Sequence, residues 1–234
     1  MALRLRLYWQ FTWIAVLLFV PVAGGLEFFQ ADALIAHAYF FHDARWVGAD
    51  SWWITGFIHT GGRWAVRLIV AAVLVFWIVS LRSPALRIYR RPSGYFVLAA
   101  VLSIGIVGLL KTVTNVHCPW DLVEFGGSFP HIPLFASRPA LLKAGQCFPA
   151  AHSSSGYALT VLYFAFRERS KLLAWLGLVL GVLVGVVFGL AQQARGAHFL
   201  SHDIWSAFLV WMILAGVYVF AFRGELWPGA SKRN

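Results

Sequence analysis

Long apolar stretches constrain this sequence more than any other feature. A helix of about 20 apolar residues crosses the hydrocarbon core of a bilayer. Only 12% of the residues are charged, roughly half the share of an ordinary soluble domain. The chain is therefore predicted to be an all-α, polytopic membrane protein with about six transmembrane helices. The six stretches lie near residues 10–29, 64–81, 95–113, 153–166, 172–191 and 203–222.

The chain shows no linker, internal repeat or low-complexity tract, so we predict a single membrane-embedded domain over residues 1–234. The first apolar stretch, near 11–26, is longer than a usual signal-peptide core, and no A-x-A pattern follows it. We expect it to remain as a membrane helix. In the fifth stretch glycines recur every few residues, and such small residues let neighbouring helices approach closely.

The basic residues predict the orientation. The net charge is +10, but no soluble module carries it as a patch, so we expect no nucleic-acid partner. Lys and Arg concentrate in cytoplasmic loops, and both termini are therefore predicted to be cytoplasmic. With the amino terminus inside, most of the 19 lysines and arginines fall on the inner side: Arg4, Arg6, Arg82, Arg87, Arg90, Arg91, Arg167, Arg169, Lys171, Arg223, Lys232 and Arg233.

The same topology gathers the histidines on the opposite side, although they were not used to choose it. The outer loops, near 30–62 and 114–152, are long and rich in Trp, Phe, His and Gly. The outer face is therefore the predicted working surface. All eight histidines fall there: His37, His42, His59, His117, His131, His152, His198 and His202.

Two outer segments could meet an anion. Lys111 ends the third apolar stretch, where a lysine either extends to water or binds an anion. The segment FPAAHSSSGY, residues 148–157, opens the fourth stretch. Its Ser153 and Ser154 either cap a helix or lie beside free backbone N–H groups that favour a phosphate-like anion.

A third outer segment, QQARGAHFLSHD, spans residues 192–203. Arg195, His198 and His202 would share one face of a helix. A cation beside two imidazoles suits an anionic substrate with nucleophilic and acid–base catalysis. The alternative is a metal site, because two histidines four residues apart are a common ligand spacing. No glutamate of the H-E-x-x-H type is present and nearby cations would repel a metal, so we expect no metal and no cofactor.

The order and placement of these three segments resemble the type-2 phosphatidic acid phosphatase superfamily, which shares its fold core with bacterial acid phosphatases and vanadium haloperoxidases. The family pattern is K-x6-R-P, then P-S-G-H, then S-R-x5-H-x3-D. The resemblance covers roughly residues 95–210. Lys111 and Pro119 keep the spacing of the first motif, but Cys118 stands where arginine is expected.

The other two motifs are also incomplete. Pro149 and His152 keep the second motif, while alanines replace its Ser-Gly. His198 fits the third, with Gln192 at the arginine position and His202 at the aspartate position. Arg195 and Asp203 lie close by in the sequence.

The resemblance implies a metal-free double displacement through a phosphohistidine. His198 would attack phosphorus, and His152 would act as general acid and then base. Lys111 and Arg195 would neutralise the phosphoryl oxygens, with Ser153 and Ser154 beside them. Either His202 or Asp203 would orient His198, His202 being the better placed on a helix.

Cys118 and Cys147 are the only cysteines and share one outer loop, each beside a motif. An oxidising outer compartment permits disulfides, so we predict that they pair. The alternative is two buried free thiols.

The resemblance implies a phosphatase that acts on a phosphorylated lipid at the periplasmic face of a bacterial inner membrane. Its substrate would be an isoprenyl pyrophosphate, phosphatidylglycerophosphate or phosphatidate, or lipid A. One alternative is a lipid-to-lipid phosphotransferase with the same phosphohistidine. Others are a catalytically inactive relative or a non-enzymatic membrane protein, such as a transporter.

Overall fold

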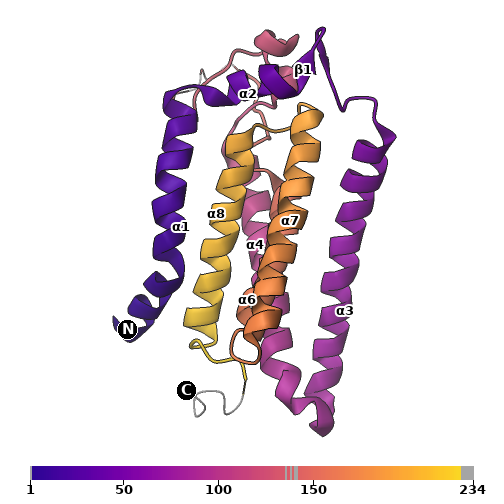
Figure 1. Ribbon diagram of the computed structural model, residues 1–234. Helices are drawn as coiled ribbons and strands as arrows, with labels where there is room; N and C mark the ends of the chain where they lie inside the picture. Colours follow the sequence, from indigo (N-terminus) through magenta and orange to yellow (C-terminus); the bar gives the residue numbers. More distant parts are fainter. Residues whose placement is uncertain (1, 135, 138, 140–141, 228–234) are drawn as a thin grey trace.

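Long helices dominate the computed structural model, which describes residues 2–134, 136–137, 139 and 142–227. They lie side by side in one bundle (Figure 1). Five helical segments of the described chain are long and apolar enough to cross a membrane. The long helices are α1 (Ala2–Phe28), α3 (Gly62–Arg82), α4 (Arg90–Val113), α7 (Lys171–Ala194) and α8 (Leu200–Gly216), which continues as a π-helical turn (Val217–Ala221).

The fourth predicted span is a broken helix. It consists of α5 (Ala151–Tyr157), a 3-10 turn (Ala158–Thr160) and α6 (Val161–Phe166). This segment packs against α4, α7 and α8, and most of its residues are buried. Its weak hydropathy follows from that position, because a helix surrounded by protein needs fewer lipid-facing side chains. The prediction of an all-α fold with about six spans is confirmed.

Glycines on α7 let it approach the broken helix closely, as their spacing predicts. A Cβ atom at Gly181 would lie 2.4 Å from the Thr160 nitrogen, and one at Gly185 would lie within 3 Å of the Tyr157 ring. A larger residue would require the Thr160 backbone to move at Gly181, or the Tyr157 ring to move at Gly185. These glycines therefore allow α7 to pack directly against the segment that carries the second motif.

The protein core lies between α4, the broken helix and α8. Tyr95, Phe164 and Leu214 are fully buried there, and the Tyr95 hydroxyl donates to the Leu214 carbonyl at 3.1 Å. Outward faces are apolar as well: Leu68 is 65% and Leu172 is 69% exposed. Apolar side chains on both sides of a helix bundle are typical of a protein surrounded by lipid.

The start of α1 and the end of α8 lie at the same end of the bundle (Figure 1). The Tyr8 and Phe220 rings are 5.6 Å apart, which links the two segments directly. The 3-10 turn Pro84–Tyr89 lies at this end as well. Most of the basic residues assigned to the inner side therefore share one end; Lys232 and Arg233 lie outside the described residues.

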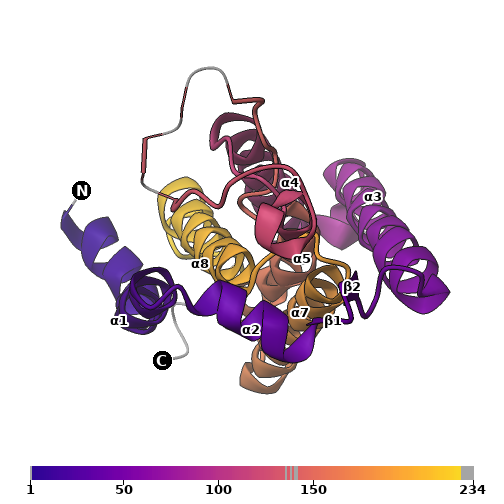
Figure 2. The same cartoon turned by 90° about the horizontal axis from the view of Figure 1, so that it is seen from above.

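The opposite end is capped by the 30–62 segment, which crosses the tops of α8 and α7 (Figure 2). The Gly48 N–H donates to the Ala194 carbonyl at 2.8 Å, which ties this cap to the end of α7. The cap thus covers the end of the bundle where the three motif segments lie. It comprises α2 (Ala31–Tyr39), the antiparallel pair β1 (Phe41–His42) and β2 (Arg45–Trp46), and a nine-residue π-helix (Trp53–Gly61) that leads into α3.

Candidate functional site

One cavity brings residues of all three motif segments together. Its volume is about 860 Å³, and it opens between α3, α4 and the end of α7. Lys111, His152, Arg195 and His198 line it. These residues are far apart in the sequence, so only the packing of the helices creates the cluster.

Local structure places each of the four side chains. Lys111 lies in the last turn of α4, and His152 in the first turn of α5. Arg195 caps the end of α7. The chain then turns at Gly196, whose φ is 76°, a conformation that suits glycine. A Cβ there would also collide with the Trp46 ring, so this turn and the cap are packed against each other.

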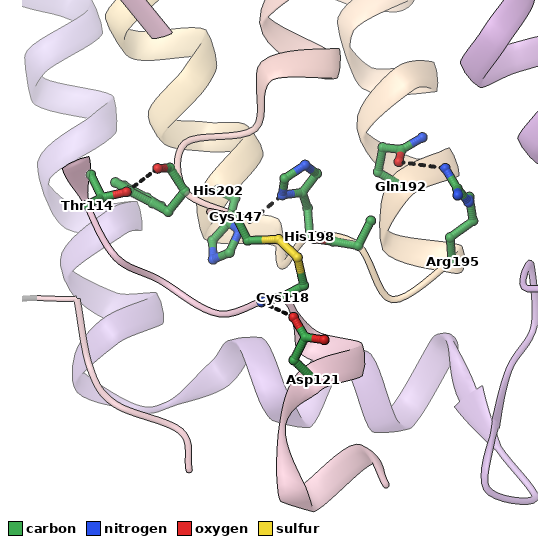
Figure 3. Close-up of a disulfide and its surroundings, with 10 residues drawn as sticks. Thr114, Cys118, Asp121, Cys147, Gln192, Arg195, His198 and His202 are labelled. Carbon is green, nitrogen blue, oxygen red and sulfur yellow. Dashed lines mark hydrogen bonds between the residues drawn. A yellow bond between two sulfur atoms is a disulfide. The ribbon is translucent and has the colours of Figure 1, made fainter. Parts of the chain in front are cut away.

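His198 and His202 form a buried pair. Their Nδ1 atoms are 3.3 Å apart (Figure 3), and the residues are 5% and 4% exposed. Burial lowers the pKa of His198 well below its usual value, and neighbouring His202 and Lys111 lower it further. His198 is therefore neutral at neutral pH. With Nδ1 facing His202, Nε2 is the ring nitrogen left for a substrate.

Asp203 points to a different partner. The Gln193 side-chain amide donates to the Asp203 carboxylate at 2.7 Å. Both residues are buried, and Asp203 does not line the cavity that holds His198. Of the two residues predicted to orient the nucleophile, the structure brings His202 to His198.

Gln192 stands at the arginine position of the third motif and contacts Arg195. Arg195 Nη1 donates to Gln192 Oε1 at 3.1 Å, and both side chains line the cavity (Figure 3). Gln192 Nε2 is buried and has no hydrogen-bond partner in the protein. Gln192 thus positions the guanidinium and leaves an N–H group available beside it.

His152 is held between two rings. It stacks on Phe188, with ring centroids 4.2 Å apart, and its ring lies 4.7 Å from that of His59. Its Nε2 atom is buried without a hydrogen-bond partner in the protein. The ring is therefore fixed in place while one nitrogen remains free for chemistry in the cavity.

Ser153 and Ser154 do not reach the cavity wall. Both are fully buried, and their hydroxyls donate to the carbonyls of Ala150 and Ala151 at 3.1 and 2.8 Å. Ser155, which sequence reasoning passed over, lines the cavity instead. The predicted contact of Ser153 and Ser154 with phosphate is not part of the site proposed below.

Cys118 and Cys147 are joined in the structure (Figure 3), the pairing that the sequence predicts, with Cα atoms 5.1 Å apart. Both line the cavity. The Cys118 N–H donates to the Asp121 carboxylate at 3.3 Å, which braces the turn after the first motif. The cross-link ties the loop after Lys111 to the segment before His152.

Besides Ser155, sequence reasoning missed three basic residues of the cavity wall: His59, Arg63 and Arg67. They come from the π-helix and α3, before the motif region. Their spacing of four residues places them on one helical face. That spacing, at the outer end of an apolar stretch, is the signal that could have revealed them.

The cavity wall is strongly basic. Among its described lining residues are four Lys and Arg side chains and no Asp or Glu. Over the same described part of the chain, no three His, Cys, Asp or Glu side chains converge as metal ligands would. The arrangement suits an anionic group beside two imidazoles.

Comparison with known families gives one match, to the PAP2 superfamily, over residues 92–225. The matched region includes Lys111, His152, Arg195 and His198. Comparisons with curated proteins and with solved structures gave no match.

Proposed function

The chain belongs to the PAP2 superfamily, and from that premise we propose that it is a membrane phosphatase that hydrolyses a lipid phosphate or pyrophosphate through a phosphohistidine. One observation carries the proposal: a single basic cavity is lined by Lys111, His152, Arg195 and His198. Two fixed cations and two imidazoles are what phosphoryl transfer to a histidine requires.

In the first step His198 Nε2 attacks phosphorus, and the bond from phosphorus to the lipid oxygen breaks. For Nε2 to carry the lone pair, Nδ1 must carry the proton and donate it to His202 Nδ1 across the 3.3 Å contact. His202 therefore holds the tautomer of the nucleophile, the general role of an orienting partner. His152, protonated when the bound phosphate anion stabilises its imidazolium, gives its Nε2 proton to the leaving lipid oxygen.

In the second step water attacks the phosphohistidine. His152 Nε2 takes a proton from that water, phosphate leaves, and His198 and His152 return to their starting states. Throughout, Lys111 and Arg195 neutralise charge on the phosphoryl oxygens, usually the largest contribution to such catalysis. Gln192 keeps the Arg195 guanidinium in position.

The shape of the cavity supports a lipid substrate. Beyond its basic end it continues between α3 and α4 over apolar side chains, including Val70, Leu74, Val101 and Ile104. A largely apolar channel with a few polar groups at one end matches an amphiphile. Isoprenyl pyrophosphate, phosphatidylglycerophosphate or phosphatidate, and lipid A are the proposed candidates.

The proposed location is a bacterial inner membrane with the cavity at the periplasmic face. The support is the basic end of the bundle, which belongs inside by the charge rule. A cysteine placed at exposed Asp43, in the β1–β2 turn, should react in intact cells with a thiol reagent that cannot cross the membrane. A cysteine at Arg169 should react only after the cells are permeabilised; the reverse result would invert the orientation.

The deciding experiment is phosphate release by the purified protein in detergent from a panel of lipid phosphates and pyrophosphates, with and without EDTA. We expect release that EDTA leaves unchanged, together with an acid-labile, base-stable phosphoenzyme. Loss of activity in EDTA with recovery on adding zinc would overturn the metal-free mechanism. Absence of release from every lipid, with transfer to an added lipid alcohol, would favour a phosphotransferase.

A further inference from the structure

Arg63 lies beside the proposed catalytic groups although it precedes the region that matches the family. It lines the same cavity as Lys111, Arg195 and His198. The charges of both Arg63 and Arg195 act on the ring of His152. One helical turn before Arg63, His59 contacts His152 directly, with ring centroids 4.7 Å apart.

Close packing fixes this part of α3 against the site. A Cβ atom at Gly62 would lie 2.5 Å from Phe188 Cζ, so the backbone next to Arg63 touches the α7 side chain that stacks on His152. The preceding nine residues, Trp53–Gly61, form a π-helix. Such windings are rare and are frequently found at functional sites.

The third basic residue on this face, Arg67, is engaged elsewhere. Its guanidinium lies over the Trp64 ring, 5.1 Å from the centroid. Arg63 has no such partner among the contacts that the structure describes, and it is exposed toward the cavity. Of the two arginines that α3 contributes to this cavity, Arg63 is therefore the one free to meet an anion.

The site also lacks cations that Arg63 could replace. Two arginine positions of the family pattern are occupied by Cys118 and Gln192, and Arg195 can stand in for only one of them. A phosphoryl group presents three oxygens, and a guanidinium can bind two of them at once. With Lys111 and Arg195, Arg63 would place three cations around the proposed phosphate position.

We propose that Arg63 is a phosphate-binding residue of this site, supplied by α3 from outside the conventional motifs. The proposal deepens the proposed function, on which its catalytic consequence rests, but phosphate binding can be measured without catalysis. It predicts that α3 is part of the active site and not only a lipid-facing helix.

The test compares Arg63→Gln, Arg63→Lys and Arg45→Gln in the full-length purified protein. Arg45 is the matched control: it lies at the same end of the bundle, is exposed, and pairs with Asp50 at 2.6 Å. Two quantities are measured, the Kd for inorganic phosphate by calorimetry and kcat/KM for a lipid phosphate. Thermal melting in detergent checks that each variant is folded.

For Arg63→Gln we expect phosphate binding to weaken about tenfold or more, the usual worth of a charge-assisted hydrogen bond. We expect kcat/KM to fall by about 10- to 100-fold. Arg63→Lys should recover part of both, and Arg45→Gln should change each less than twofold.

Each contrary result has a separate meaning. Unchanged phosphate binding and turnover in Arg63→Gln, or an equal loss in Arg45→Gln, would overturn the role of Arg63 and leave the proposed function standing. A wild-type protein that binds phosphate but hydrolyses no lipid would overturn the proposed function, and the binding comparison alone would then decide on Arg63. A wild-type protein that neither binds phosphate nor releases it would overturn both.

Discussion

Two cavities meet at the His198–His202 pair, and their charges are opposite. His198 lines the larger one, whose described wall includes Lys111, Arg63 and Arg195 and no carboxylate. His202 lines a second cavity of about 340 Å³, between α1, α2, α8 and the 116–134 loop. The described wall of that cavity carries Glu27 and Asp32 and no Lys or Arg.

The carboxylates of the second cavity already have partners in the fold. Asp32 accepts a hydrogen bond from the Ser201 N–H at 3.0 Å and so caps the start of α8. Glu27 accepts from the Leu134 N–H at 3.1 Å. These acids hold the outer segments together and disfavour an anion, whereas the cations of the larger cavity attract one. On the proposed function, the imidazole pair would therefore face phosphate on one side only.

The largest expected effect is loss of the proposed nucleophile. His198→Ala should lower phosphate release at least ~10³-fold, because a residue that forms the covalent intermediate cannot be bypassed. The matched control is His131→Ala, since His131 lines the acidic cavity. Initial rates on the best lipid phosphate measure both.

His131→Ala should retain most of the activity. Equal losses in the two variants would remove the functional difference between the cavities. Melting curves would show whether either variant is misfolded.

The second-largest expected effect on activity is that of removing a cation from the basic cavity. Lys111→Met should lower kcat by roughly 10²- to 10³-fold, since the charge that stabilises the phosphoryl oxygens in the transition state is removed. Lys143→Met, an exposed lysine of the outer loop, serves as control for a general change in surface charge. If both variants lost activity equally, the lysines would act by attracting the anionic substrate to the protein surface. Local stabilisation of the transition state by Lys111 would then be contradicted.

A smaller loss of activity should follow when the hydrogen bond between His198 and His202, which joins the walls of the two cavities, is broken. His202→Phe should lower kcat by about 10- to 10²-fold with little change in KM, because His198 loses the partner that holds its tautomer and orientation. His202→Gln, which can still form a hydrogen bond, should recover part of the rate.

Asp203→Asn distinguishes the two candidates for that orienting role. Because Asp203 accepts a hydrogen bond from Gln193, the substitution should act mainly on stability. It should lower the melting temperature and have only a small effect on kcat. A larger loss of kcat in Asp203→Asn than in His202→Phe would transfer the role to Asp203.

The smallest effects concern the dependence of stability on pH, to which His198 and Asp32 should contribute with opposite signs. The pKa of His198 is lowered by burial, so the unfolded chain binds more protons once the pH falls below about 6.5, and stability falls by up to ~1.4 kcal/mol per pH unit. Burial raises the pKa of Asp32, so the folded chain binds more protons just above pH 3.8, and acidification adds stability there.

Melting temperatures across pH 4–7 would check these signs in the wild type, His198→Gln and Asp32→Asn. Acidification should lower the melting temperature less in His198→Gln than in the wild type. It should lower it more in Asp32→Asn. Parallel curves for all three proteins would contradict both assignments.

Several features could be predicted from sequence because their causes act locally along the chain. A bilayer requires long apolar helices, and hydropathy located them even where the fourth is broken at Ala158–Thr160. The spacing of glycines predicted the close approach of α7, and Cys118 and Cys147 were identified as a pair because they share one loop. Similarly, three motif segments predicted to lie on one face of the membrane do line one cavity.

Other features depend on how each helix is rotated and which side chains it meets, and hydropathy carries no such information. Ser153 and Ser154 point to backbone carbonyls, and Asp203 points to Gln193. Arg63 and His59 join the site although they lie far from the motifs in sequence.

The sequence by itself determined the membrane class, the spans and the end of the bundle where the three motif segments lie, because burial of apolar surface in lipid is nearly additive along the chain. Only the tertiary structure decided which imidazole faces His198, which cations surround the proposed phosphate position, and that the two cavities differ in charge. Those outcomes follow from packing at a few close contacts, such as Gly62 on Phe188 and Gly196 on Trp46, where moving one backbone by an ångström would change every partner.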